Sequence, residues 1–216
     1  MPSQPLSVLS TLALKGVLEK LRPKAELRFD ATQAILKRIA DGERADILIL
    51  TEEAMADLQK KGRVRDVRPM GSSGVGVAVR AGAPRPDIGS VDAFWHALVS
   101  ARSVAHSRVG ASGLYFAKLL EQSGKELKKR IVVEKGPVAL VVASGEAEIG
   151  IQQLCELAPV PGIDIVGPLP GPLQALTHFA AGVTADAAEP ARAAALIAQI
   201  RSAIGPADHI LPRDAA

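Results

Sequence analysis

The segment FDATQAILKRIADGERADILIL, residues 29–50, decides the fold class. It begins with the end of a strand, passes through a polar loop and continues as a helix in which Ile35, Leu36 and Ile39 share one face. Gly42 can end this helix, and the apolar run ADILIL then has the length of a strand. A strand that is apolar on both faces is typical of a parallel sheet covered by helices on both sides. The segment therefore predicts a β-α-β unit.

The same alternation extends in both directions from this segment. A β-α-β-α-β-α order predicts a parallel sheet with right-handed crossovers. A second series of strands and helices follows, then a Pro- and Gly-rich connector at 156–174 that contains a strand. MGSSGVG, residues 70–76, lacks the Gly-Lys-Ser/Thr ending of a phosphate-binding loop. We therefore interpret it as a turn before a strand. The other expected elements are strands at 6–10, 25–29, 75–82, 103–106, 130–134, 148–154 and 177–184, and helices at 12–22, 52–62, 91–100, 112–124, near 137–145 and at about 187–204.

Composition limits the classes of function. The chain has 216 residues, of which 48% are hydrophobic, so it can form one large domain or two small lobes. Only 3% of residues are aromatic and the net charge is +3, which argues against a nucleic-acid partner. The densest basic run, Lys125 to Arg130, reads as a solvated helix end.

Cysteine usage and hydropathy give further expectations. Cys155 is the one cysteine, with apolar neighbours, so we expect a buried thiol, no zinc site and no other metal or cofactor. No apolar stretch approaches the roughly 20 residues of a membrane span, so no membrane insertion is expected. The start MPSQPLSVLS lacks the pattern of a signal peptide. The protein is therefore expected in the periplasm if a signal peptide was removed, and in the cytoplasm if the sequence is complete.

Small and polar residues recur where a strand is followed by a helix. Ligands of open α/β sheets bind outside the carboxyl ends of the strands, where helix N-termini offer free N–H groups to anions. Four such junctions are predicted, and each one alone can be ordinary helix capping. Together they favour a cradle for an anion or a polar solute. The junctions are Ser10-Thr11, Ala31-Thr32-Gln33, Gly110-Ala111-Ser112-Gly113 and Gly136-Pro137.

Read in order, LSVLSTLALKGVL, FDATQAILKRIADGERADILIL, GVGVAVRAGAP, SGLYFAKLLEQSG and VALVVASGEAEIGI resemble the molybdate-binding proteins of ABC importers. More broadly, the chain is similar to class II periplasmic solute-binding proteins. The resemblance implies an α/β fold of two lobes, each a mixed, mainly parallel sheet flanked by helices, with a ligand cleft between them. Residues 1–75 plus 176–216 would form one lobe and 76–175 the other. It also implies a monomer that captures a small anionic solute for an ABC permease.

The resemblance further implies that neutral donors hold the solute: the hydroxyls of Ser10, Thr11 and Thr32 and the amides near Ser112. Three departures make an organic carboxylate plausible instead of molybdate. Asp30 begins a loop that is a run of serines in the family, Gln152-Gln153 stand where a tyrosine is usual, and Arg108 suits a bidentate carboxylate. The predicted ligand-binding residues are Ser10, Thr11, Ala31, Thr32, Gln33, Ser73, Arg108, Ser112, Gly113, Pro137, Gln152 and Gln153.

Two other functions use this fold. Some relatives of molybdate-binding proteins resemble isomerases of unsaturated tricarboxylates such as aconitate. Asp30, Glu134 or Lys135 could then supply a base and Arg108 a carboxylate clamp. His106 is the histidine beside a predicted ligand loop, and it reads as a structural residue. The effector domain of a transcription regulator ranks last, because the chain starts directly on the first strand without a helix-turn-helix. No catalytic residue is assigned.

Overall fold

The structure, a computed structural model, describes residues 4–212. The chain divides into two compact units. Unit 1 consists of Met1–Ser72 and His178–Ala216, and unit 2 consists of Ser73–Thr177. Two strands, β4 (Val64–Arg80) and β9 (Leu176–Thr184), run from one unit into the other.

The sheet of unit 1 has the strand order β2-β1-β3-β9-β4. β1 (Leu6–Thr11) lies between β2 (Ala25–Asp30) and β3 (Ile47–Thr51) and is parallel to both. Thr11 is paired with Asp30, so the parallel strands end at the same edge of the sheet. β9 runs antiparallel to β3, with Phe179 opposite Thr51. This edge therefore carries the carboxyl ends of three strands and the beginning of the fourth.

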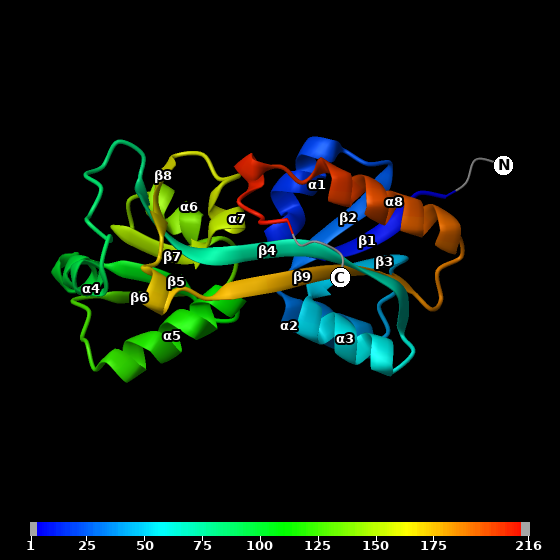
Figure 1. The fold of residues 1–216 in the computed structure, drawn as a ribbon, viewed down its shortest axis with the longest axis horizontal. Coiled ribbons are helices and arrows are strands. Elements are labelled where there is room, and N and C mark those ends of the chain that lie inside the picture. Colours follow the sequence, from blue (N-terminus) through cyan, green and yellow to red (C-terminus); the bar gives the residue numbers. More distant parts are fainter. Residues whose placement is uncertain (1–3, 213–216) are drawn as a thin grey trace. The chain divides into compact units, whose positions relative to one another are not determined.

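Helices cover both faces of the unit 1 sheet (Figure 1). η1 (Leu12–Leu14) leads into α1 (Lys15–Leu21), which contacts α8 (Pro190–Ala203) on one face. α2 (Thr32–Ala40) and α3 (Glu52–Lys60) cover the other, where Leu9, Ile35, Met55 and Ala180 share one buried apolar cluster. The short helix η3 (Pro206–Asp208) follows α8. The apolar positions at helical spacing are thus the residues that bury each helix against the sheet.

The sheet of unit 2 contains β4, β7 (Ile149–Gln153), β5 (Val104–Ser107) and β6 (Arg130–Val133), in that order. β5 is parallel to both β6 and β7, whereas β4 is antiparallel to β7 and to β8 (Ile163–Pro168). The sheet is therefore mixed, with the parallel part predicted from the alternation of elements. The carboxyl ends of β5, β6 and β7 lie at one edge.

Neighbouring residues of β5 show how the unit 2 sheet is covered. Val104 packs with Phe94 of α4 (Val91–Ser100) and Phe116 of α5 (Ala111–Ser123). Ala105 points to the other face and packs with Val138 of α6 (Val138–Ala143). The remaining helices of this unit are the short α7 (Leu154–Leu157) and η2 (Gly171–Leu173).

The turn predicted at MGSSGVG is wrong. Residues 70–76 lie inside β4, which continues without interruption from Val64 to Arg80. Gly71 has a φ of 118°, and a Cβ there would lie 2.6 Å from the carbonyl oxygen of Leu211. Glycine lets the strand approach the C-terminal segment closely enough for the bridge between Ser72 and Leu211. The glycines that were predicted to form a turn instead allow β4 to pass close to neighbouring segments.

A glutamine side chain completes β4 within unit 2. The amide of Gln174 accepts a hydrogen bond from the backbone nitrogen of Val75 at 2.8 Å and donates to its carbonyl oxygen at 2.9 Å. This side chain therefore takes the place of a backbone partner beside β4. The Pro- and Gly-rich connector contains β8, as expected, and this amide adds a second attachment to the sheet.

Candidate functional site

Two predicted donors stand at the carboxyl end of β1 in unit 1. Ser10 and Thr11 are buried. The Ser10 hydroxyl donates to the carbonyl oxygen of Thr11 at 2.9 Å, and the Thr11 hydroxyl oxygen accepts from the nitrogen of Ala13 at 3.4 Å. Both hydroxyls have protein partners, and the long capping bond of Thr11 is the weaker of the two.

In unit 1, β2 is followed directly by α2. The nitrogen of Ile35 is the first to donate within this helix, to the carbonyl oxygen of Ala31, so the amides of Thr32 and Gln33 precede the helical ladder. Asp30 accepts from the nitrogen of Ala31 at 2.9 Å, and its carboxylate lies 3.6 Å from the guanidinium of Arg38. The negative charge of Asp30 is therefore partly offset beside a donor-rich helix start.

The corresponding edge of unit 2 carries a second donor-rich turn, at the junction of β5 and α5. The Ser107 hydroxyl oxygen accepts from the nitrogens of Val109 and Gly110, at 3.3 and 3.0 Å. Ser112 is buried in the first turn of α5. A Cβ at Gly113 would lie 2.0 Å from the carbonyl oxygen of Ser107, so only glycine lets α5 sit this close to the strand end.

Arg108 forms an exposed ion pair at this edge. Its Nε lies 2.6 Å from both carboxylate oxygens of Glu134, which follows β6. The side chains of Arg108 and Glu134 are 57% and 62% exposed. Exposed pairs of this kind are worth about 0–1 kcal/mol, so a carboxylate of similar geometry can replace Glu134 at little energetic cost.

Three further predicted residues are buried where β7 ends and β4 passes. Gln152 accepts from the nitrogen of Ala139 at 3.2 Å and donates to Glu156 at 2.5 Å. Gln153 donates to the carbonyl oxygen of Ser73 at 3.3 Å, and the Ser73 hydroxyl oxygen accepts from the nitrogen of Cys155 at 3.1 Å. These polar side chains connect α6, β4 and α7 inside unit 2. Pro137, also predicted, is the cap residue that precedes α6.

Two ionisable groups near these residues have shifted pKa values. Burial raises the pKa of Glu156 to about 7, and the hydrogen bond from Gln152 opposes this shift. Burial, followed by the nearby charge of Glu156, raises the pKa of the Cys155 thiol far above its ordinary value. A thiol in this state is a poor nucleophile, so Cys155 is not a candidate for covalent chemistry.

His106 is held in a structural environment. It is buried, its Nδ1 lies 3.0 Å from the carbonyl oxygen of Ser107, and Arg130 donates to its Nε2 at 2.7 Å. Burial is the largest cause of its lowered pKa, and the charge of Arg130 acts in the same direction. The ring is therefore neutral, with the proton on Nδ1, and it supports the end of β5.

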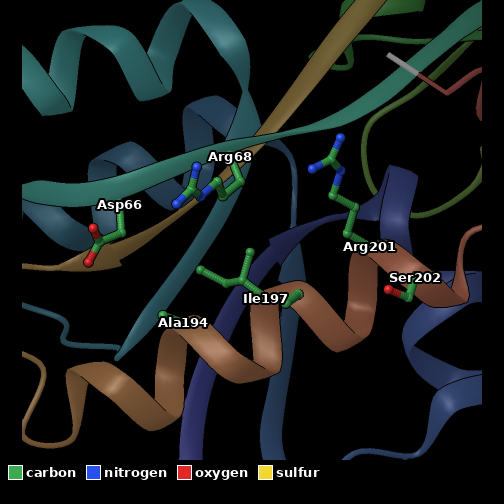
Figure 2. A pocket seen from close by; sticks show the side chains of 7 residues that line it. Asp66, Arg68, Ala194, Ile197, Arg201 and Ser202 are labelled. Atoms are coloured by element: carbon green, nitrogen blue, oxygen red, sulfur yellow. The ribbon is translucent and has the colours of Figure 1, made fainter. Parts of the chain in front are cut away.

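A cavity of about 470 Å³ lies in unit 1 but involves none of the predicted site residues. It is formed by β4, which carries Asp66 and Arg68, and by α8, which carries Ile197, Arg201 and Ser202 (Figure 2). Ala194 and Ala198 complete its lining.

Within residues 4–212, no three His, Cys, Asp or Glu side chains gather in a way that could hold a metal ion. No helix in this range is both long and apolar enough to cross a bilayer.

The structure thus groups the predicted residues within each unit. Ser10, Thr11, Ala31, Thr32 and Gln33 gather at the unit 1 edge, and the other seven lie in unit 2. Sequence reasoning missed Ser107, whose hydroxyl shapes the turn before α5, although its place after an apolar strand was a usable signal. It also missed Glu156 and His178, which no local motif marks.

Comparisons with known proteins agree with this architecture. A family model described as bacterial extracellular solute-binding protein matches residues 20–207. An aconitate isomerase from Pseudomonas sp. is 36% identical over 93% of this chain and 84% of its own length. The periplasmic molybdate-binding protein of Azotobacter vinelandii superposes with a TM-score of 0.74 at 18% identity, covering 96% of this chain and 100% of that one.

A third similar structure is the substrate-binding domain of a putative molybdenum ABC transporter from Clostridium difficile. Its TM-score is 0.66 at 14% identity, over 92% of this chain and 93% of that one. The fold is therefore that of the periplasmic binding proteins, an α/β fold whose sheets are flanked by helices, and this prediction is confirmed. The chain belongs to the family of bacterial extracellular solute-binding proteins. Its general role is to bind a solute.

Proposed function

We propose that this protein binds a small organic polycarboxylate of the aconitate class, in preference to molybdate, and passes it to an ABC permease. One observation carries the proposal. At the carboxyl edge of the unit 2 sheet, Arg108 already binds both oxygens of a carboxylate, that of Glu134, in an exposed pair that can exchange. A guanidinium that donates to both oxygens of a planar carboxylate is suited to binding an organic acid.

Neutral donors lie close to this positive charge within unit 2. The first turn of α5 offers backbone N–H groups and the hydroxyl of Ser112, beside the loop that carries Arg108. The start of α2 in unit 1 offers N–H groups of the same kind at Thr32 and Gln33. A carboxylate bound at the unit 2 edge can therefore use neutral donors of α5 together with the guanidinium of Arg108.

Apolar side chains at the unit 2 edge also favour an organic solute. Val109, Leu114 and Leu140 are 44%, 54% and 55% exposed, and they lie in the loop before α5 and in the first turns of α5 and α6. Exposed apolar groups beside a polar site are suited to the hydrocarbon part of a ligand. Molybdate has no such part.

The family supports the proposed partner and compartment. The family model is described as that of an extracellular solute-binding protein, which supports a periplasmic location with an ABC permease as the receiver of the solute. Specificity for the carboxylate, delivery of the solute to an ABC permease and the twelve predicted contacts are parts of this proposal.

Isothermal titration calorimetry with a panel of anions tests the ligand class. The panel contains trans-aconitate, cis-aconitate, citrate, molybdate, tungstate, sulfate and phosphate. We expect measurable heats and a raised melting temperature with at least one tricarboxylate, because a ligand stabilises the state that it binds. Binding of molybdate or tungstate alone would refute the carboxylate proposal and would support the hypothesis that the solute is an inorganic oxyanion.

Isomerisation of an unsaturated tricarboxylate is the second candidate function. The relative that is 36% identical over 93% of this chain is an aconitate isomerase, which favours this candidate specifically. The reaction needs one base, which removes a proton from the methylene carbon and leaves the electron pair delocalised over three carbons. Returning the proton to the other end carbon moves the double bond without changing the composition.

Three side chains are candidates for this base. Glu134 lies beside Arg108, Asp30 beside Arg38, and Lys135 follows Glu134. Incubation with trans-aconitate in deuterated water, followed by NMR, separates binding from catalysis. Deuterium at a ligand carbon together with conversion to the cis isomer would establish the isomerase. Binding with no deuterium uptake and no conversion would leave the transport function.

A further inference from the structure

His178 has an unusual buried nitrogen. Among the residues that the structure describes, two buried side-chain nitrogens have no hydrogen-bond partner, Nε of Arg28 and Nδ1 of His178. The rest of the Arg28 guanidinium binds Glu43 and the carbonyl oxygen of Arg44. His178 has no such compensation. Buried polar atoms are normally satisfied, so an unpaired one requires a functional or structural explanation.

The position of His178 in unit 1 suggests the explanation. Phe179 is paired with Thr51, the last residue of β3, so His178 stands just beyond the end of that strand. It therefore lies at the same edge of the sheet as the carboxyl ends of β1 and β2. This is the edge at which open α/β sheets bind their ligands.

The face of the sheet can also be assigned. Ala180 packs into the apolar cluster under α2 and α3, and so does Leu9 of β1. Side chains two residues apart on a strand share a face, so His178 lies on the face of Ala180 and Thr11 on the face of Leu9. His178 and the predicted donor Thr11 therefore occupy the same face at the same edge, the one covered by α2 and α3.

We infer that Nδ1 of His178 binds a carboxylate of the solute at the unit 1 edge. This inference rests on the proposed function, since it names one more residue that recognises the proposed ligand. A ring carrying its proton on Nδ1 donates that N–H to a carboxylate oxygen, which gives the buried nitrogen the partner that it lacks. The role is recognition of the ligand and requires no proton transfer.

Three substitutions separate this role from a structural one. His178→Leu removes both ring nitrogens, His178→Asn keeps an amide near the position of Nδ1, and His178→Gln keeps one near the position of Nε2. Each variant is titrated with trans-aconitate by calorimetry, and its melting temperature is measured without ligand. We expect at least a tenfold weaker affinity for His178→Leu and His178→Gln and a smaller loss for His178→Asn.

The melting temperatures without ligand provide the second readout. Because Nδ1 has no partner in the free protein, His178→Leu should leave the melting temperature unchanged or raise it. Equal affinity of wild type and all three variants would overturn the inference while leaving the proposed function intact. Failure of the wild type to bind any carboxylate would overturn the proposed function itself. If His178→Leu does not fold, the comparison of His178→Asn with His178→Gln still decides, and equal losses in both would refute a role for Nδ1.

Discussion

Substitutions of Arg108 and Glu134, which form an ion pair, are expected to change the affinity for the solute in opposite directions. Glu134 occupies the guanidinium that the solute is proposed to bind, so the two carboxylates compete. The pair is more than half exposed on both sides and is worth at most about 1 kcal/mol. Glu134→Gln should therefore tighten the binding of trans-aconitate by up to about fivefold, because it removes a competitor and a negative charge.

Arg108→Ala should have a larger effect in the other direction. A hydrogen bond to a charged group contributes about 1.5–3 kcal/mol, which corresponds to a loss of about 10- to 150-fold in affinity. Calorimetry at low and high salt measures both variants, and both effects should shrink as salt screens the exposed charges.

A matched control exists in unit 2. Arg102 and Glu148 form an exposed pair at 2.9 Å, and they precede β5 and β7 at the amino ends of these strands. The pair therefore lies away from the carboxyl edge, and Glu148→Gln should leave the affinity for trans-aconitate unchanged. The reasoning would be refuted if Arg108→Ala bound trans-aconitate within twofold of wild type. It would also fail if Glu134→Gln weakened binding as strongly as Arg108→Ala does.

The remaining predictions concern stability, measured by thermal denaturation. Gly113→Ala places a Cβ against the carbonyl oxygen of Ser107 and should cost at least about 2 kcal/mol, or roughly 4–8 °C, whereas Gly171→Ala enters open space and should change little. The pKa of Glu156 is raised from 4.5 to about 7, so the native state keeps a proton that the unfolded chain has released, and stability should fall as pH rises across that interval. Glu156→Gln should abolish this fall and stabilise the protein above pH 7 by on the order of 1–3 kcal/mol, and equal pH profiles for both proteins would contradict the assignment. Gln174→Ala removes the partner of the Val75 backbone N–H, whereas the Val75 carbonyl oxygen keeps its hydrogen bond from the nitrogen of Leu169, so the change should cost about 1–3 kcal/mol, and an unchanged melting temperature would show that water replaces the amide.

Local periodicity was sufficient to predict most elements of the fold. The apolar spacing of Ile35, Leu36 and Ile39 and the run that contains β3 correspond to a helix and a buried strand in the structure. The first half of β4 was not predicted, because its glycines, serines and proline are typical of turns. Gly71 is in the strand for a tertiary reason, the close approach of Leu211, and no local pattern contains that information.

The candidate site was predictable only in part. Strand-to-helix junctions are visible in the order of elements, so residues such as Thr32 and Ser112 could be proposed from the sequence. Pairings over long separations could not be. Arg108 and Glu134 are 26 residues apart, and their contact depends on the neighbouring positions of β5 and β6. The unpaired nitrogen of His178 is likewise visible only when all its surroundings are in place.

The burial of Cys155 has a practical consequence. The chain contains one thiol, and it is inaccessible and held far from its reactive form. Maleimide dyes should therefore leave the folded wild-type protein unlabelled. A cysteine introduced at an exposed position such as Leu140, beside the proposed ligand edge, would then be the one group to react. The protein could carry a single fluorophore that reports solute binding without removal of its native cysteine.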